Sequence, residues 1–466
     1  MSAVAQKPRT EEIEQYFKKY PDVPREVILK PDLLNLGQRF SDAALEATHG
    51  AMVKSYRLFS YDLVPMESMS RQEYRKAPEW FTICKGPYQL RPVTVQTTLA
   101  PDSPYIVDVI DGKLWLCVDG KQIAEVAYPR AGDYDFKTFE DGTAYRDIIA
   151  FGSFITVFRA CQYWGIKEEC KFCDINENAR QMKTDQSYTV TAPVKEVAKV
   201  VEVAKEIERV AHAQAGYPIP LSFIITGGTI TDHLHGKTED DFYMEYVEAV
   251  KWGGPRRKVA LQTNAKDKET LKRYRATGVD VYHANMEVWD RKLFEWICPG
   301  KNERIGYDEW IRRTVDAVDV FGEGNVVPNF VCGAEMAQPY GFKTVAEAVK
   351  STTEGMEFLM SHGVYPRFNH WRREPIAYLA REYDQPPPPL EFYILLMRNR
   401  HEIWKKYRLP MPDQYGAHPE SRVMGAAHGT YSDYILLMEQ RDYEKQAWEA
   451  LEQGRAIWGP EASAVK

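Results

Sequence analysis

The stretch FITVFRACQYWGIKEECKFCDI, residues 154–175, joins a strand-like run to three cysteines. Residues 154–160 are mostly β-branched and aromatic, a pattern typical of a buried strand. Cys161 follows at once, and Cys170 and Cys173 come after eight further residues, with two residues between them. The sequence therefore predicts a strand whose end leads three thiols onto one loop.

The chain downstream of this stretch repeats an alternation of strand and helix patterns. Each apolar run is followed by an amphipathic segment, the first of them over residues 193–213. The second helix opens with Thr238 and Asp241, and the last with Thr344 and Glu347, both at capping-box spacing. The further predicted strands are residues 221–226, 258–263, 280–288, 325–331 and 364–369. Six such units predict a parallel sheet with helices outside it, either a closed or partial βα barrel or a doubly wound sheet. Functional residues should lie at the carboxyl ends of the strands in both cases.

The rest of the chain predicts parts around this sheet. Residues 75–147 read as a small β-rich domain whose short strands turn at Asp111-Gly112 and Asp119-Gly120. We expect an N-terminal helical segment over 1–74, the barrel over 148–376 and a helical C-terminal extension over 377–466, which follows a proline run.

Bulk composition excludes several classes of protein. The 466 residues are 44% hydrophobic and 27% charged, with a formal net charge of -7 and no long lysine or arginine run, which disfavours a nucleic-acid partner. The N-terminal residues lack the apolar segment of a signal peptide, and no apolar run approaches the ~20 residues of a membrane span. We expect a soluble cytoplasmic protein, in which three clustered cysteines favour a metal or reactive thiols over a disulfide framework.

Three thiols on one loop are compatible with more than one kind of metal site. A structural zinc site takes four ligands, commonly as two cysteine pairs, and this chain has one Cys-x-x-Cys pair. A [4Fe-4S] cluster also takes four ligands, so three cysteines would leave one iron open. A zinc knuckle completed by a distant ligand, or incidental thiols, are the alternatives.

The cysteine loop resembles that of the radical S-adenosylmethionine (radical SAM) enzymes. Their usual signature is Cys-x3-Cys-x2-Cys after the first strand of a six-stranded partial barrel, with an aromatic residue before the last cysteine. Here CKFC supplies the pair and Phe172, and the first spacing is eight. The resemblance implies an α/β partial (βα)6 TIM-like barrel with the β-rich and helical additions above, and a [4Fe-4S] cluster on Cys161, Cys170 and Cys173.

The same resemblance implies where S-adenosylmethionine (SAM) would bind. The positions that match the family lie at the ends of the second to fifth predicted strands. In the family, a glycine pair, polar side chains and a further glycine at these positions face the ligand. Glycines permit close backbone approach to a ligand, although ordinary turns also use them. With the aromatic of the cysteine loop, the expected cofactor-binding residues are Phe172, Thr226, Gly227, Gly228, Asn264, Asn285, Glu287, Val331 and Gly333.

A cluster of candidates for the substrate side follows the fifth and sixth strands. Cys332 lies at the mouth end of the fifth strand, and Arg367, His370 and Arg372 surround the end of the sixth. Arginine side chains bind a carboxylate or phosphate well, so these residues are candidates to anchor an anionic substrate. The alternative is that they form a solvated charged rim of the barrel. We therefore expect a small organic substrate with one anionic group.

The resemblance also implies the activity. Reductive cleavage of SAM would give a 5′-deoxyadenosyl radical that abstracts a hydrogen atom from a small molecule, with an electron donor such as flavodoxin or ferredoxin. Residues 375–466 contain no cysteine, so an auxiliary cluster there is excluded. Rearrangement, epimerisation, fragmentation, dehydrogenation and carbon–carbon bond formation remain open. A non-catalytic iron–sulfur or zinc scaffold is the alternative function.

Overall fold

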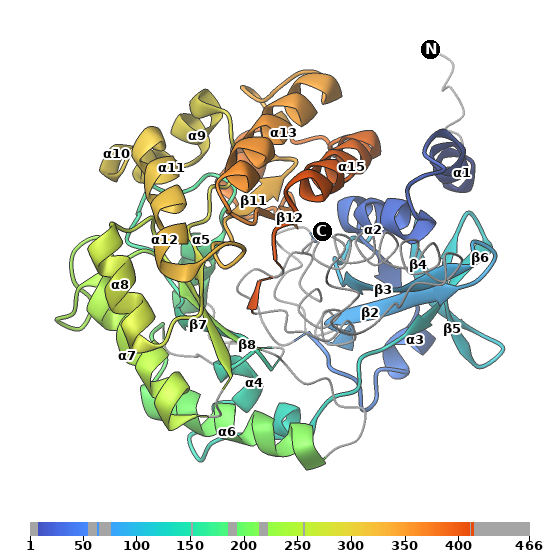
Figure 1. Ribbon diagram of the computed structural model, residues 1–466. Helices are drawn as coiled ribbons and strands as arrows, with labels where there is room; N and C mark the ends of the chain where they lie inside the picture. Colours follow the sequence, from blue (N-terminus) through green and yellow to red (C-terminus); the bar gives the residue numbers. More distant parts are fainter. Residues whose placement is uncertain are drawn as a thin grey trace, which may run out of the picture.

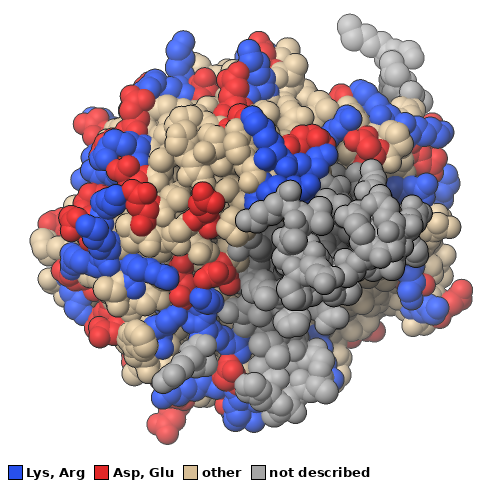
Figure 2. Space-filling model, in the orientation of Figure 1, with Lys and Arg blue, Asp and Glu red and all other residues tan. Residues whose placement is uncertain are grey.

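The computed structural model describes residues 8–54, 63–64, 76–150, 152–184, 193–213, 222–254, 257–410 and 412–413. Within this part, the chain forms a βα barrel with an N-terminal β-sheet beside it (Figure 1). No helix of the described residues is long and apolar enough to cross a membrane. Basic and acidic side chains are interspersed over most of the described surface in Figure 2.

Six parallel strands follow one another in space in the order of the sequence. They are β7 (Phe154–Phe158), β8 (Ser222–Gly227), β9 (Lys258–Gln262), β10 (Val281–His283), β11 (Asn329–Cys332) and β12 (Arg367–His370). β7 to β10 form one sheet, β11 pairs with β12, and parallel bridges join Tyr282 to Val326 and Glu287 to Phe330. Since β7 and β12 do not pair among the described residues, the barrel is partial, which confirms the predicted fold.

Amphipathic helices cover the outside of these strands (Figure 1). They are α6 (Val197–Ala213), α7 (Glu239–Gly253), α8 (Lys268–Thr277), α11 (Tyr307–Asp316), α12 (Val318–Phe321) and α13 (Val345–Ser361). The predicted caps form, because Thr238 Oγ1 accepts from the Asp241 N–H, and Thr344 forms a capping box with Glu347.

Three short helices were not predicted. α5 (Ile175–Thr184) begins two residues after Cys173, in place of the expected loop. α9 (Arg291–Ile297) and α10 (Pro299–Arg304) lie between β10 and α11. The strand predicted over 280–288 is shorter than expected and ends at His283, and Glu287 beyond it has a positive φ of 68°.

The N-terminal part combines helices with one sheet that is antiparallel except where β1 pairs with β4 in parallel. Its strand order is β1-β4-β5-β6-β2-β3, and Asp111, Gly112, Asp119 and Gly120 all have positive φ, as the predicted tight turns require. The helices are α1 (Arg9–Lys19), α2 (Arg25–Leu36), α3 (Asp42–Glu46), η3 (Asp133–Phe136) and α4 (Tyr145–Ile148). The strands are β1 (Arg39–Phe40), β2 (Trp80–Lys85), β3 (Leu90–Gln96), β4 (Ile106–Ile110), β5 (Lys113–Val118) and β6 (Lys121–Ala127).

The N-terminal sheet and the barrel share one hydrophobic core, to which Val93 of β3 and Phe368 of β12 both belong. Buried Arg372 donates to Thr98 Oγ1 at 3.0 Å and to Gln96 Oε1 at 3.1 Å, so the sheet also meets the barrel through polar contacts. The remaining elements are η4 (Ala334–Met336), α14 (Tyr378–Glu382) and α15 (Leu390–Tyr407). The predicted helical extension from residue 414 onward lies outside the described residues.

Candidate active site at the barrel mouth

A cavity of about 220 Å³ lies within the partial barrel, lined by residues that begin β7, β11 and β12 and by residues at and beyond the ends of the strands. It brings together most of the side chains that the sequence singled out. Those that line it are Cys170, Phe172, Cys173, Thr226, Gly227, Asn285, Glu287, Val331, Arg367, His370 and Arg372. Five predicted residues are not among its lining: Cys161, Gly228, Asn264, Cys332 and Gly333.

The start of the cysteine loop is held by the helix that follows the loop, and its end by a turn of its own. The Cys161 N–H donates to Asn176 Oδ1 at 2.8 Å, and Asn176 Nδ2 donates to the Tyr163 carbonyl at 2.7 Å. The Cys173 N–H donates to the Cys170 carbonyl at 3.0 Å, which closes a tight turn around the pair. α5 therefore fixes the loop that carries the three thiols.

The three thiols lie near enough to influence one another electrostatically. Burial, followed by the charge of Cys170, raises the pKa of the Cys161 thiol to about 12. Burial also raises the pKa of Cys173 well above its usual range. A hydrogen bond from the Cys298 thiol lowers the pKa of Cys170. Because metals bind thiolates, a metal at this loop would displace protons from these sulfurs.

The two glycines after β8 have a packing explanation in the structure. A Cβ on Gly228 would lie 1.8 Å from the Ala160 carbonyl oxygen and 2.5 Å from Cys161 Cα. A Cβ on Gly227 would lie 2.5 Å from the Tyr243 hydroxyl. The end of β8 therefore lies directly against the start of the cysteine loop, while contact of these glycines with a ligand stays a prediction.

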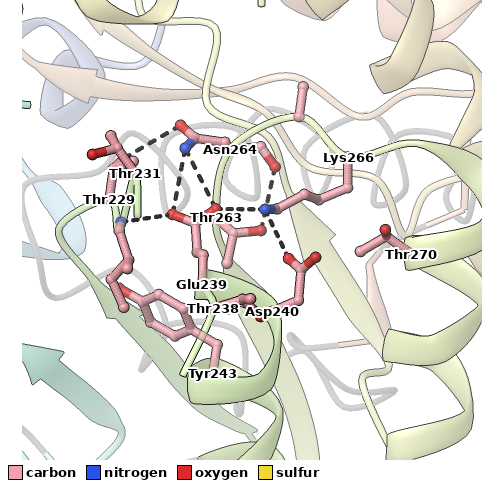
Figure 3. Close-up of polar contacts among 12 residues, drawn as sticks. Thr229, Thr231, Thr238, Glu239, Asp240, Tyr243, Thr263, Asn264, Lys266 and Thr270 are labelled. Atoms are coloured by element: carbon pink, nitrogen blue, oxygen red, sulfur yellow. Dashed lines mark hydrogen bonds and ion pairs between the residues drawn. The ribbon is translucent and has the colours of Figure 1, made fainter. Parts of the chain in front are cut away.

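Asn264 does not line the cavity and lies in a polar network with Thr229 and Glu239 (Figure 3). Its Oδ1 accepts from Thr229 Oγ1 at 3.3 Å, and its Nδ2 lies 3.4 Å from both oxygens of Glu239. Buried Glu239 also accepts from the Ile230 N–H at 3.1 Å and pairs with Lys266 at 2.6 Å. The Thr229 N–H in turn donates to the Sγ of the first cysteine at 3.3 Å. Asn264 thus supports the segment that contacts the cysteine loop. It does not line the cavity, and its predicted contact with the cofactor stays a prediction.

Glu287 is held in the cavity wall by a buried ion pair. Lys301 Nζ lies 2.6 Å from Glu287 Oε1 and donates to the Asn285 carbonyl at 2.9 Å. The two side chains are 10% and 9% exposed. Glu287 also has a positive φ, an uncommon conformation for a residue with a side chain, and such strain clusters at functional sites.

We expect Lys301→Met to lower the free energy of unfolding by about 3–5 kcal/mol, because it leaves the Glu287 carboxylate buried without its cation. Denaturant unfolding of the purified chain measures the loss. The double variant Lys301→Met with Glu287→Gln should recover most of it, since no unpaired charge remains. Lys350→Met, at an exposed pair with Glu354, is the matched control. Native-like stability of the single variant would contradict the buried pair.

The segment that joins α9 to α10 is a part of the site that the sequence analysis missed. Fully buried Cys298 contacts Cys170, the Ile297 carbonyl accepts from the Lys171 N–H at 2.8 Å, and the Gly300 N–H donates to the Glu168 carbonyl at 3.1 Å. These contacts hold the cysteine loop from Glu168 to Lys171. A lone cysteine far away in the sequence gives no signal of this contact.

The substrate-side candidates divide into two groups. Arg367, His370 and Arg372 line the cavity and are buried, and His370 stacks on Tyr393 with ring centroids 4.5 Å apart. Burial, with Arg372 and Arg373 nearby, holds the pKa of His370 well below its usual range, which favours the neutral imidazole. Cys332 is fully buried and does not line the cavity.

The sequence is similar to that of a bacteriochlorophyllide c C-7(1)-hydroxylase from Chlorobaculum limnaeum. The two are 24% identical over 307 residues, which cover 63% of this chain and 70% of the hydroxylase. No protein-family model matches the chain.

Three solved structures are similar over part of their length. Methylornithine synthase PylB is 16% identical with a TM-score of 0.36 over 53% of this chain and 61% of that one. The FeFe-hydrogenase maturase HydG of Carboxydothermus hydrogenoformans is 11% identical with a TM-score of 0.38 over 54% and 51%. Coproporphyrinogen III oxidase HemN of Escherichia coli, a radical SAM enzyme, is 11% identical with a TM-score of 0.34 over 60% and 59%. The chain thus spans 51% to 61% of the length of these structures.

The structure bears on the family that the cysteine motif resembles. It places the three cysteines on the loop that follows the first strand of a six-stranded partial barrel. The chain is thus similar to the radical SAM enzymes in its cysteine motif and in its partial barrel, as the sequence predicted.

Proposed function

We propose that the chain holds a [4Fe-4S] cluster on Cys161, Cys170 and Cys173, binds SAM beside it, and abstracts a hydrogen atom from a small anionic molecule. One observation supports this most strongly. Cys170 and Cys173 line the same cavity as the residues expected for SAM and as Arg367, His370 and Arg372. Cofactor and substrate would therefore meet in one enclosed space.

The residues present fit the cluster in their donor chemistry. All seven cysteines of the chain are free, so each of the three thiols can act as a ligand. The Thr229 N–H at Cys161 and the Cys298 thiol at Cys170 supply hydrogen bonds to sulfur, which is the usual surrounding of iron–sulfur ligands. Among the described residues, no three His, Cys, Asp or Glu side chains, the three cysteines included, are grouped so that they could hold a metal ion, so the fit rests on donor chemistry.

When bound, the cluster with its open iron supplies the electron that cleaves SAM. The protein residues hold and orient the reactants. We assign Phe172, Thr226 and Gly227 to the wall around SAM, with Asn285 and the fixed carboxylate of Glu287 as polar contacts.

The surroundings of the cavity keep water away from the reaction. Buried Trp371 lines the cavity, and Arg372 ties its wall to the N-terminal sheet. A dry chamber protects a reactive radical. Phe172 lies on the loop that follows β7, and Thr226 and Gly227 lie at the end of β8. Arg367 and His370 lie on β12. SAM and substrate can therefore occupy different sides of one cavity. We also propose a cytoplasmic location, where reducing conditions keep the thiols free.

The reaction after hydrogen abstraction is left to experiment. The relative is named for a hydroxylation of bacteriochlorophyllide c, and we include that compound among the test substrates. Reduced enzyme with a flavodoxin or ferredoxin donor and SAM should form 5′-deoxyadenosine above background when a small-molecule fraction is added. Stimulation by RNA or protein fractions alone would contradict a small substrate. Absence of SAM turnover with every fraction would instead favour the non-catalytic scaffold.

A further inference from the structure

Strands β11 and β12 place two polar side chains opposite each other in the cavity wall. Asn329 is the register partner of Arg367, and Val331 is the partner of Asn369. All four residues line the cavity. Because side chains alternate along a strand, Phe330 and Phe368 point to the other face, into the core.

Three polar side-chain atoms of this group are buried and have no partner among the described residues. Arg367 is 3% exposed and Asn329 is 2% exposed. Arg367 Nε, Asn329 Oδ1 and Asn369 Oδ1 have no hydrogen-bond partner within the part of the chain that the structure describes. Nor does the Arg367 guanidinium form an ion pair with any described residue. Buried polar groups are normally hydrogen-bonded and buried charges paired, so a group left unpaired toward a cavity points to a ligand.

The neighbouring arginines show that this state is specific to Arg367. Arg372 donates to Gln96 and Thr98, and Arg373 donates to the carbonyls of Gln385 and Asn35. Both are held by the protein itself. Arg367 is therefore the arginine best placed to give its guanidinium to a bound molecule.

We propose that Arg367, Asn329 and Asn369 form the subsite for the substrate's head group, which is a carboxylate with a hydroxyl or amino group on the adjacent carbon. The guanidinium donates to the carboxylate, and the amide oxygens accept from the neighbouring O–H or N–H. This inference rests on the proposed function and deepens it by naming the chemistry of the anion. The methionine end of SAM also carries a carboxylate beside an amino group, so the test separates the two sources.

Three small carboxylates that differ in one group test the subsite. Propionate, lactate and alanine carry hydrogen, hydroxyl and ammonium beside the carboxylate, and calorimetric titration into reconstituted enzyme with saturating SAM measures their affinity. Lactate and alanine should bind about tenfold more tightly than propionate, because each adds a hydrogen bond to the buried amide oxygens. Equal affinities for all three would overturn the proposal, and so would loss of all binding when SAM is added, since SAM would then occupy the subsite.

Variants assign the effect to the residues. Arg367→Met should weaken binding of all three carboxylates by at least about tenfold. Asn329→Leu should remove the preference for lactate and alanine while leaving propionate affinity nearly unchanged. Asn329→Asp should fold, melt at a higher temperature because its carboxylate pairs with Arg367, and no longer bind propionate. Native affinities in Arg367→Met or Asn329→Asp would overturn the proposal.

A separate measurement distinguishes failure of this subsite from failure of the proposed function. Iron content per chain reports the cluster on its own loop and should be the same in Arg367→Met as in the native chain. A native chain without iron would refute the proposed function, whereas a loaded chain that shows no preference among the three carboxylates would refute the subsite alone.

Discussion

Replacement of Cys161, Cys170 and Cys173 by Ala should leave the chain folded and unable to retain iron after anaerobic reconstitution. The three thiols are the expected ligands, and no other cysteine lies on their loop. The native chain should carry about four iron and four sulfide and appear brown, while the triple variant should be colourless. Iron and sulfide analysis with the visible absorption spectrum measures the difference.

A matched control removes thiols elsewhere. Cys84 and Cys117 lie in β2 and β5 of the N-terminal sheet, so Cys84→Ala with Cys117→Ala should keep the full iron content. Circular dichroism must show that the triple variant retains its fold. A folded triple variant that still holds its cluster would show that other residues are the ligands.

Gly228→Ala should lose most of its iron although no ligand is changed. The added methyl group would lie 1.8 Å from the Ala160 carbonyl oxygen and 2.5 Å from Cys161 Cα, so the start of the cysteine loop must move. Overpacking of this kind also costs about 1–3 kcal/mol of stability. Iron content per folded chain, compared with the denaturant midpoint, separates loss of ligand geometry from general destabilisation.

Gly253→Ala is the steric control for this variant. Gly253 ends α7, and a Cβ there would meet only Val201 Cγ1 and Cγ2 at 3.6 and 3.8 Å, ordinary contact distances. Its iron content should equal that of the native chain. If Gly228→Ala also kept native iron content, the contact between the end of β8 and Cys161 would not position the cluster ligand.

The order of the barrel strands could be predicted because each buried strand leaves a short apolar run bounded by turn residues. Local backbone conformation limited how precisely the ends of the strands and the helices between them could be predicted. The fourth strand ends at His283, Glu287 adopts a positive φ, and α9 and α10 occupy the following chain. None of these features follows from hydrophobic periodicity, because each is a matter of local backbone conformation.

The candidate site, like the fold, could be predicted only in part. A motif places three thiols on one loop, and strand ends place Glu287 and Arg367 near them. The direction of each side chain depends on tertiary packing, so Asn264 contacts Thr229 and Glu239 and does not line the cavity. The contact of Cys298 with Cys170 joins residues far apart in the sequence, and the pairing of Asn329 with Arg367 requires the register of two strands.

The most direct test of the account is electron paramagnetic resonance of the dithionite-reduced native chain, recorded with and without SAM alongside metal analysis. The account predicts about four iron per chain and a reduced [4Fe-4S] signal that changes when SAM is added, because three cysteines leave one iron open to it. Zinc in place of iron, or a cluster signal that SAM leaves unchanged, would contradict it.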